Sequence, residues 1–472
     1  MPRTLPLTDP DLALATDLYQ LTMAAAYHAA ARDDGSTPRA TFELWVRRLP
    51  RRRRFLVFAG LEQALASLRD LSFTYEQIDY LRALEPFRNV APSFFDLLAE
   101  LRFTGDVRAM PEGTVFFADE PVLSLTGTLL ETQLVETLLL SIVNFQTAIA
   151  SKAARVRLAA GEEATVVEFG SRRAHGPQAA SWAARAAWVG GVDATSNVLA
   201  GQRTGMPVVG TMAHSFVMAY EREIDAFRSY QQTFPEHTTL LVDTYDTLEG
   251  VRTALASGGP FGGVRLDSGD LGELARESRR LLDEGGREDA RIFASGDLDE
   301  EKIAALRAAG APIDAYGVGT QLATSADAPY LPGIYKLVEI ERDGETRPTF
   351  KLASGKAIYP GPKQVIRLVD GGDDGRRFAG DRLIRRADEG DEPPANRLLV
   401  PVMEHGEPLA ASPAAPFDAA TARRRCREQL ARLPDALRSL TPVDDGEEVY
   451  PVLVDPRLEA LLARQRAGLP GG

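Results

Sequence analysis

The sequence predicts an α/β fold, an irregular TIM-like α/β barrel packed on a second α/β domain built from the segments before and after the barrel. Its 472 residues exceed one ordinary domain of about 150 residues, so two or three domains, or one barrel with additions, are expected. Short runs rich in Val, Ile and Leu recur between residues 161 and 340 with helical stretches between them, a pattern typical of repeated βα units. The expected domains are therefore residues 1–130, 131–340 and 341–472.

The first third of the chain mixes helical and strand signals. Residues 17–31 are predicted to form a helix, and a Gly-to-Pro turn separates them from a strand at 40–46. Two short β-like runs follow at 115–118 and 122–125, bounded by Pro-Glu-Gly and Asp-Glu-Pro turns. A long helix with apolar periodicity is then expected over about 129–160.

Barrel strands are expected where the apolar runs end in polar or glycine residues. The predicted strands are 165–169, 192–196, 208–211, 239–243, 263–267, 291–295, 315–319 and 333–337. Seven or eight such units suffice for a barrel. Because barrel sites are assembled from loops at the carboxyl ends of the strands, the polar residues that end these runs are the candidates for a functional site.

The last part of the chain predicts strands and then a helix. Residues 341–401 return to turn-and-strand composition, and their strands would pack most simply on the N-terminal part. The Asp-Gly-Gly-Asp-Asp-Gly run at 370–375 predicts an exposed loop. A helix is expected over 416–440, and residues 468–472 are expected to be frayed.

Composition and charge exclude several classes of protein. The 54 basic and 67 acidic residues leave a net charge of -13, which argues against sequence-independent binding to nucleic acid or to an anionic membrane. The single cysteine, Cys426, allows neither an intrachain disulfide nor a thiolate metal cluster, and we expect it on a helix surface. Residues 1–17 lack the apolar core of a signal peptide, and the uncharged stretches are shorter than the roughly 18 residues of a membrane span. A soluble cytoplasmic protein is expected.

Two strand-end motifs combine rings with cations. Glu-Phe-Gly-Ser-Arg-Arg at 168–173 puts an aromatic ring and two guanidiniums at one strand end, which suits a flat ring together with a phosphate or a carboxylate. Thr-Met-Ala-His-Ser at 211–215 places a histidine directly after a strand and at the start of a helix.

Further strand-end motifs supply groups that hold ribose diols and Mg²⁺-phosphates. Asp-Thr-Tyr-Asp at 243–246, Arg-Leu-Asp-Ser-Gly-Asp at 265–270 and Ser-Gly-Asp at 295–297 contain carboxylates, hydroxyls and glycines. Gly-Val-Gly-Thr at 317–320 offers backbone N–H groups to a phosphate. Each motif alone is a weak signal, but their recurrence at successive strand ends indicates a functional site.

Together these motifs resemble the nicotinate phosphoribosyltransferase family. The likeness covers Thr16–Met23, Phe42–Arg47, Glu112–Thr114, Glu168–Arg172, Ala194–Gly201, the later strand ends and Gly361–Val365. As a combined pattern it is highly specific and runs through most of the chain. Two departures stand out: Arg51–Arg54 are more basic than the usual loop of the family, and the cysteine cluster that binds zinc in some relatives is missing.

The resemblance implies both a fold and an activity. Members of the family fold as an irregular α/β barrel packed on a second α/β domain. They join nicotinate to phosphoribosyl pyrophosphate, giving nicotinate mononucleotide and pyrophosphate with coupled hydrolysis of ATP, in NAD salvage. Mg²⁺ would be carried by phosphoribosyl pyrophosphate or ATP and not by a protein cage. The protein itself then mainly positions two anions and stabilises a departing one.

The resemblance also implies roles for individual residues. Phe169 and Tyr19 would sandwich the pyridine ring, with Tyr19 coming from the other subunit of a homodimer that shares its active sites. Arg172 and Arg265 would neutralise the carboxylate or the phosphates. The ribose and phosphate groups would be held by Asp267, Ser268, Gly296, Asp297, Gly319 and Thr320.

Position alone leaves other interpretations open for four of these residues. Tyr19 also fits a core aromatic on an amphipathic helix, and Asp297 also fits a helix N-cap. Arg172 and Arg265 each fit a surface ion pair equally well.

His214 matches the phosphorylated histidine of the family. Transfer of the ATP γ-phosphate to a ring nitrogen needs a neutral imidazole with one nitrogen free and the other oriented by a partner. We expect Asp243, on the following strand end, to be that partner. The phosphohistidine would favour tight binding of phosphoribosyl pyrophosphate and so link ATP hydrolysis to product formation. Taken singly, any of the five histidines would more often be solvated or structural.

The choice between pyridines turns on Ser196. In nicotinamide phosphoribosyltransferases the resemblance suggests an aspartate at this place, which accepts a hydrogen bond from the amide and would repel nicotinate. The neutral hydroxyl of Ser196 can donate to a carboxylate, so a preference for nicotinate is predicted, with Asp193 as the alternative if the alignment is displaced by three residues. Two other functions stay open, a nicotinamide phosphoribosyltransferase and a catalytically inactive metabolite-binding barrel.

Overall fold

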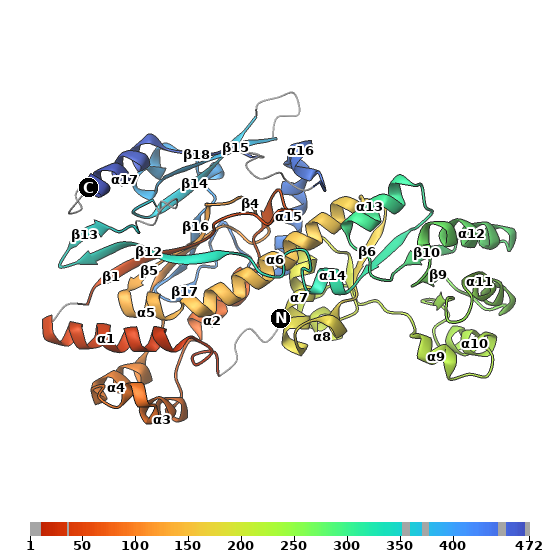
Figure 1. The fold of residues 1–472 in the computed structure, drawn as a ribbon, viewed down its shortest axis with the longest axis horizontal. Helices are drawn as coiled ribbons and strands as arrows, with labels where there is room; N and C mark the ends of the chain where they lie inside the picture. Colours follow the sequence, from red (N-terminus) through yellow and green to blue (C-terminus); the bar gives the residue numbers. More distant parts are fainter. Residues whose placement is uncertain (1–10, 35–36, 352–358, 371–376, 442–449, 468–472) are drawn as a thin grey trace. The chain divides into compact units, whose positions relative to one another are not determined.

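The computed structural model describes residues 11–34, 37–351, 359–370, 377–441 and 450–467 (Figure 1). The chain divides into two compact units, and the division falls inside helix α6 (Glu136–Ala160). Residues 149–329 form the parallel unit, and described residues 11–148 and 330–467 form the antiparallel unit. All but the first residue of the loop predicted at 370–375, and the end predicted at 468–472, lie outside the described residues.

The antiparallel unit is built on a seven-stranded sheet of order β13-β12-β1-β5-β3-β16-β17. Its helices are α1 (Leu18–Asp34), α2 (Leu61–Arg69), α3 (Tyr75–Ala83), α4 (Pro92–Glu100), α5 (Leu129–Leu134), α15 (Ala419–Arg432), α16 (Asp435–Arg438) and α17 (Pro456–Ala467). Its strands are β1 (Arg39–Val46), β2 (Leu56–Val57), β3 (Asp106–Ala109), β4 (Val115–Phe116), β5 (Pro121–Thr128), β12 (Gly333–Arg342), β13 (Glu345–Pro348), β14 (Lys363–Val369), β15 (Phe378–Arg385), β16 (Val400–Glu404), β17 (Glu407–Pro408) and β18 (Val452–Val454).

Strand β1 lies inside this sheet, and this position accounts for its apolar residues. It pairs antiparallel with β12 on one side and with β5 on the other, so its backbone groups are bonded along both edges. Phe42, Leu44 and Val46 are buried in the main apolar core of the unit. Alternate residues of a strand share one face, which accounts for this spacing of two.

The parallel unit contains a six-stranded parallel sheet of order β7-β6-β11-β10-β9-β8. Its strands are β6 (Thr165–Glu168), β7 (Ala194–Thr195), β8 (Thr239–Leu241), β9 (Gly263–Leu266), β10 (Arg291–Ala294) and β11 (Ala315–Val318). Its helices are α7 (Pro177–Val189), α8 (Val198–Thr204), α9 (His214–Met218), α10 (Glu223–Thr233), α11 (Thr247–Ala256), α12 (Leu271–Glu284), α13 (Glu300–Ala308) and α14 (Thr320–Ala323), with a 3-10 turn at Ser171–Arg173. Each strand of this unit is followed along the chain by at least one helix, as in repeated βα units, and three helices lie between β7 and β8.

The predicted α/β fold class is confirmed, but two of the predicted barrel strands are wrong. The segment 208–211 makes only an isolated bridge from Val208 to Thr195, because Pro207 cannot donate a ladder hydrogen bond and Gly205 turns the chain with a positive φ. Residues 333–337 open strand β12 of the antiparallel unit, where they pair with β1. The parallel sheet therefore has six strands among the described residues, not seven or eight.

Two predicted helices are each divided. The helix expected over 129–160 is α5 and α6, with a break at Val135. The helix expected over 416–440 is α15 and α16, separated at Pro434, whose ring cannot continue a helix. Cys426 is fully buried on α15 instead of lying on its surface, and burial raises the pKa of its thiol to about 12.

A buried ion cluster joins helix α6 to the start of α13 and to the segment after α14. Lys152 Nζ lies 2.6 Å from Glu300 Oε2 and 3.0 Å from Asp327 Oδ1, and Arg155 Nε donates to Glu300 Oε1 at 2.9 Å. Burial alone would raise the pKa of Glu300, but the two cations hold it below its usual value. Glu300 opens α13 and Asp327 follows α14, so the cluster supports the segments that follow β10 and β11.

Candidate active site

The predicted residues of the parallel unit gather at one edge of its sheet. Carboxyl ends of parallel strands meet at the same edge, where α/β proteins bind ligands. These ends carry Phe169 and Arg172 after β6, Ser196 after β7, Asp243 after β8, Asp267 and Ser268 after β9, Gly296 and Asp297 after β10, and Gly319 and Thr320 after β11. His214 is the first residue of α9, and Arg265 lies within β9.

A chain of hydrogen bonds starts at His214. Its Nε2 lies 3.1 Å from Asp243 Oδ1, and the carboxylate is 1% exposed while the imidazole is 41% exposed. The second oxygen of Asp243 accepts from the backbone N–H of Asp267 at 3.0 Å and from Ser268 Oγ at 2.6 Å. The buried carboxylate is therefore held on both oxygens, and it fixes the histidine while the rest of the ring faces solvent.

The loop after β10 is fitted closely against the loop after β9. Ser295 Oγ donates to Asp267 Oδ1. Gly296 has φ +100°, and a Cβ there would clash with the carbonyl oxygen of Asp267, so glycine is required. Asp297 is also left-handed, with φ 47°. The N-cap interpretation of Asp297 is wrong, because Asp299 caps α13 by accepting from Lys302 N–H.

Arg265 is a half-buried cation in this edge. Its Nη1 donates to Thr211 Oγ1, and its Nε has no hydrogen-bond partner among the described residues. Burial lowers the pKa of Arg265, the carboxylates of Asp267 and Asp243 raise it, and Arg172 lowers it again. The guanidinium of Arg265 is half-buried and that of Arg172 is exposed, and the charges of both act on this part of the sheet edge. A carboxylate or phosphate of a ligand would compensate their charge.

Phe169 lies between the ends of β6, β10 and β11. Its ring centroid is 5.4 Å from that of Phe293, with the planes inclined by 53°. A Cβ on Gly317 would lie 2.7 Å from the Phe169 ring, so this glycine makes room for it. Phe169 also donates its N–H to Val318 O at 2.9 Å, next to Gly319 and Thr320, which begin α14. The ring is only partly buried, and a partly exposed aromatic ring can stack on a flat ligand.

Ser196 lies directly beside the end of β6. Its N–H donates to the carbonyl of Glu168 at 3.0 Å, and its side chain is half-buried. Asp193 precedes β7, and its Oδ2 accepts from Arg157 Nη1 at 2.7 Å and from Val166 N–H at 2.9 Å. Asp193 is thus engaged at the amino end of the strands, while Ser196 lies at the carboxyl end.

Tyr19 belongs to the antiparallel unit. It is 48% exposed on α1, so the interpretation as a core aromatic is wrong. Partial burial, then the charges of Glu136 and Asp17, raise the pKa of its phenol. The side chain is available on the surface of its own unit.

Several polar residues of the edge were not among the individual site residues predicted from the sequence. They are Glu168, Ser171, Thr195, Asn197, Thr211 and Ser295. All but Ser171 and Thr211 lie within two residues of a strand end, and for those four residues that position is the signal that would have found them. Their partners are distant in sequence, which no local pattern reveals.

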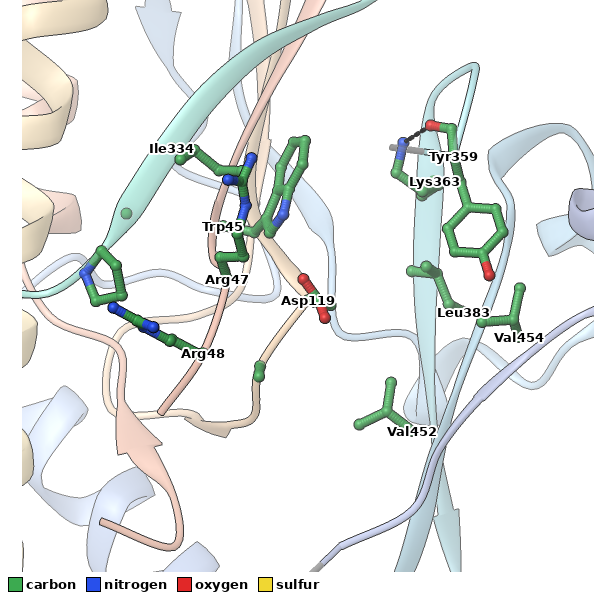
Figure 2. A pocket seen from close by; sticks show the side chains of 13 residues that line it. Trp45, Arg47, Arg48, Asp119, Ile334, Tyr359, Lys363, Leu383, Val452 and Val454 are labelled. Carbon is green, nitrogen blue, oxygen red and sulfur yellow. Dashed lines mark hydrogen bonds between the residues drawn. The ribbon is translucent and has the colours of Figure 1, made fainter. Parts of the chain in front are cut away.

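A separate cavity of about 710 Å³ lies in the antiparallel unit (Figure 2). Arg47, Arg48 and Asp119 line it on one side and apolar side chains of β15 and β18 on the other. Burial raises the pKa of Asp119 to about 6, against the opposing charge of Arg47. Lys363 also lines the cavity, but its Nζ is bound by Glu43 Oε2 at 2.7 Å and by two backbone carbonyls. None of the residues predicted for the site lines this cavity.

Within the described part of the chain, no group of three or more His, Cys, Asp or Glu side chains is arranged to hold a metal ion. In the same residues no helix has the length and apolar character needed to cross a membrane.

Two protein-family models match the chain. The model of the nicotinate phosphoribosyltransferase N-terminal domain matches residues 14–144, and that of the quinolinate phosphoribosyl transferase C-terminal domain matches residues 149–328. The second match coincides with the parallel unit.

Relatives and a solved structure agree with these matches. Nicotinate phosphoribosyltransferase pncB2 of Mycobacterium tuberculosis is 45% identical over 460 residues, covering 96% of this chain and 94% of its own. The nicotinate phosphoribosyltransferase of Bacillus subtilis is 45% identical over 371 residues, covering 77% and 74%. The crystal structure of human nicotinic acid phosphoribosyltransferase superposes with a TM-score of 0.79 at 30% identity, covering 95% of this chain and 99% of that one.

Proposed function

The chain belongs to the nicotinate phosphoribosyltransferase family, and we propose that it joins nicotinate to phosphoribosyl pyrophosphate in NAD salvage, releasing nicotinate mononucleotide and pyrophosphate. One observation carries the proposal: five kinds of group lie at the same edge of the sheet. They are the aromatic ring and arginine after β6, the neutral serine after β7, the histidine that is hydrogen-bonded to an aspartate, and the glycine-containing loops after β10 and β11. The pyridine nitrogen attacks the anomeric carbon of the ribose, and the bond from that carbon to pyrophosphate breaks. Such a reaction requires positioning and charge stabilisation.

The pyridine would bind between Phe169 and Ser196. The partly exposed ring of Phe169 offers a stacking face, and the hydroxyl of Ser196 offers a donor to the carboxylate. Arg265, with its buried and unpaired Nε, supplies a charge that a bound anion would compensate. This set favours nicotinate over nicotinamide, because no carboxylate stands in the place of Ser196.

The ribose and phosphates would bind along the loops after β9, β10 and β11. Asp267 and Ser268 suit ribose hydroxyls, while Gly296, Asp297, Gly319 and Thr320 suit a phosphate through backbone N–H groups. Mg²⁺ would arrive with the pyrophosphate of phosphoribosyl pyrophosphate or with ATP, and when bound there it neutralises charge on the leaving group. Carboxylates such as Asp267 are fitting ligands for the hydrated ion.

His214 would accept the γ-phosphoryl group of ATP. The bond between the γ-phosphorus and the bridging oxygen breaks, a nitrogen–phosphorus bond forms, and ADP leaves; water later releases phosphate. Asp243 supports this step, because a carboxylate that accepts the Nε2 proton leaves the lone pair on Nδ1 and stabilises the charge of the phosphorylated ring. Coupling to ATP hydrolysis would therefore require both His214 and Asp243.

The active form would be a cytoplasmic homodimer with shared sites. Tyr19, exposed on α1, would cover the pyridine bound in the other subunit, as the family resemblance implies. An exposed tyrosine carries a large apolar area with a polar tip, which suits such a contact.

A product assay tests the proposal. Purified protein with nicotinate, phosphoribosyl pyrophosphate and Mg²⁺ should form nicotinate mononucleotide slowly without ATP and faster, to a higher yield, with it. Nicotinamide in place of nicotinate should give little product. Equal turnover of the two pyridines would favour a nicotinamide phosphoribosyltransferase, and no release of pyrophosphate with either would favour an inactive metabolite-binding barrel.

A further inference from the structure

Glu168, the last residue of β6, is a fully buried carboxylate next to the proposed pyridine site. Its Oε1 accepts the N–H of Gly170, and its Oε2 accepts from Thr195 Oγ1 at 2.6 Å. Burial raises the pKa of Glu168, and the two hydrogen bonds lower it. A buried charge is tolerated only where donors satisfy it, so both partners are held firmly.

Thr195 connects Glu168 to the loop after β7 through two hydrogen bonds. Its Oγ1 accepts the N–H of Asn197 at 2.9 Å while its proton is given to Glu168. Asn197 Nδ2 donates to Ser171 Oγ at 3.0 Å, and Ser171 is bonded covalently to Gly170. The hydrogen bonds therefore close a circuit through Glu168, Gly170, Ser171, Asn197 and Thr195, which we name the Glu168 circuit.

The Glu168 circuit joins the two loops between which the pyridine would lie. One loop carries Phe169 and Arg172, and the other carries Ser196. Ser196 is enclosed on both sides, since its own N–H donates to the Glu168 carbonyl and the residues before and after it belong to the circuit. We propose that Glu168 and Thr195 are positioning residues that set the distance between the stacking ring and the carboxylate donor, and so determine the affinity for nicotinate.

This inference rests on the proposed function and deepens it. None of the circuit's side chains needs to touch the substrate, because they act through the backbone of Phe169, Arg172 and Ser196. The circuit is made only by residues at the ends of β6 and β7, whereas ribose and phosphate would be held by the loops after β9, β10 and β11, none of which contributes a residue to it. Loss of the circuit should therefore weaken nicotinate binding selectively.

Thr195→Val tests the inference, because it keeps the shape of the side chain and removes the hydroxyl. The KM for nicotinate should rise about tenfold, the effect of losing one hydrogen bond to a buried charge. The KM for phosphoribosyl pyrophosphate and the kcat at saturating nicotinate should stay within about twofold of wild type. Thr195→Ser keeps the hydroxyl and should restore the KM for nicotinate. Damage to the fold would instead lower kcat for all substrates and leave both KM values unchanged.

Ser171→Ala supplies a second variant, at a half-buried position. It should raise the KM for nicotinate by about threefold. In the double variant with Thr195→Val, the KM for nicotinate should rise by less than the product of the two single increases, because both substitutions break the same circuit. The matched control is Thr204→Val, at the far end of α8, whose hydroxyl bonds Ala200 O at 2.8 Å. It should leave the KM for nicotinate unchanged.

The outcomes separate this inference from the function on which it rests. No nicotinate mononucleotide from the wild-type protein contradicts the proposed function itself. A working wild-type enzyme whose KM for nicotinate is unaffected by both Thr195→Val and Ser171→Ala, or whose two effects simply add, contradicts the Glu168 circuit alone.

Discussion

His214 Nε2 lies 3.1 Å from Oδ1 of Asp243, a carboxylate that is almost completely buried. The other oxygen of that carboxylate is bonded to the loop after β9, so its orientation is set before any ligand arrives. Within the described residues Nδ1 of His214 has no hydrogen-bond partner, and the ring is 41% exposed. A histidine held at one nitrogen and open at the other suits phosphoryl transfer, and the first prediction concerns this pair.

Asp243→Asn should slow phosphorylation of the protein by ATP about 10- to 100-fold, because an amide at this place does not fix the histidine tautomer or stabilise the charged ring. Acid-labile labelling from γ-labelled ATP measures the rate. His214→Ala should abolish the label and the ATPase activity while leaving slow, ATP-independent transfer. Label that persists in His214→Ala would show that another residue is phosphorylated.

Ser196→Asp should lower kcat/KM for nicotinate about 10- to 100-fold, because a carboxylate there faces the carboxylate of the substrate. Turnover of nicotinamide should be unchanged or higher. Product formation with each pyridine at several concentrations gives the ratio. Ser196→Ala is the control that separates repulsion from loss of the hydroxyl, and an equal loss in the two variants would rule out the electrostatic explanation.

Gly296→Ala should destabilise the protein by at least about 2 kcal/mol, since φ is +100° and the added Cβ would clash with the Asp267 carbonyl. Urea unfolding of the two proteins measures the difference. Gly286→Ala is the control: it also has a positive φ, of +70°, but no atom lies within 4 Å of an added Cβ. A smaller loss for Gly296→Ala than for Gly286→Ala would contradict the role given to the close contact.

Stability should fall as the pH rises through the titration of Glu223. Burial raises the pKa of this residue from 4.5 to about 7, with a smaller opposite effect of a hydrogen bond with Thr253. Below about pH 4.5 the carboxyl group is protonated in both states. Between pH 4.5 and 7 the carboxyl group of Glu223 loses its proton in the unfolded protein but keeps it in the folded protein. The free energy of unfolding therefore falls over this range, and the contribution of Glu223 to stability is lost by about pH 7.

Glu223→Gln removes this titration, and the variant should exceed the wild type in urea midpoint at pH 8 but not at pH 4. Midpoints measured in half-unit steps of pH give the difference between the two curves. A constant difference across the range would mean that Glu223 does not titrate there.

Mixed dimers test whether the sites are shared. A dimer purified with one Tyr19→Ala subunit and one His214→Ala subunit should have about half of the wild-type ATP-coupled activity, because a two-fold dimer with shared sites keeps one intact site. Each variant alone should be strongly impaired. Mixed dimers no more active than the two parents together would show that Tyr19 does not serve the partner's site.

Much of the site was predictable because its signals are local. Phe169 and Asp267 directly follow the last residues of β6 and β9, and Gly296 follows β10 after one residue, so the end of a buried strand is readable there from a few residues. His214 instead begins α9 after the segment 208–211, which is not a strand. Parallel strands bring their carboxyl ends to one edge, so a set of strand-end motifs already indicates a common site. The α/β fold class follows from the same alternation of runs.

Features that depend on distant partners were not predictable from local patterns. Residues 333–337 have the composition of a barrel strand, but they pair with β1 because pairing depends on which sheet edge the folded chain offers. Cys426 is buried although its neighbours on α15 are mainly charged, since packing and not composition covers that face. The Glu168 circuit likewise needs Thr195 and Asn197, some 27 and 29 residues away, to come within 3 Å of its other members. Local sequence specifies which groups end each strand, whereas sheet pairing and burial, which involve segments far apart in the chain, specify what those groups touch.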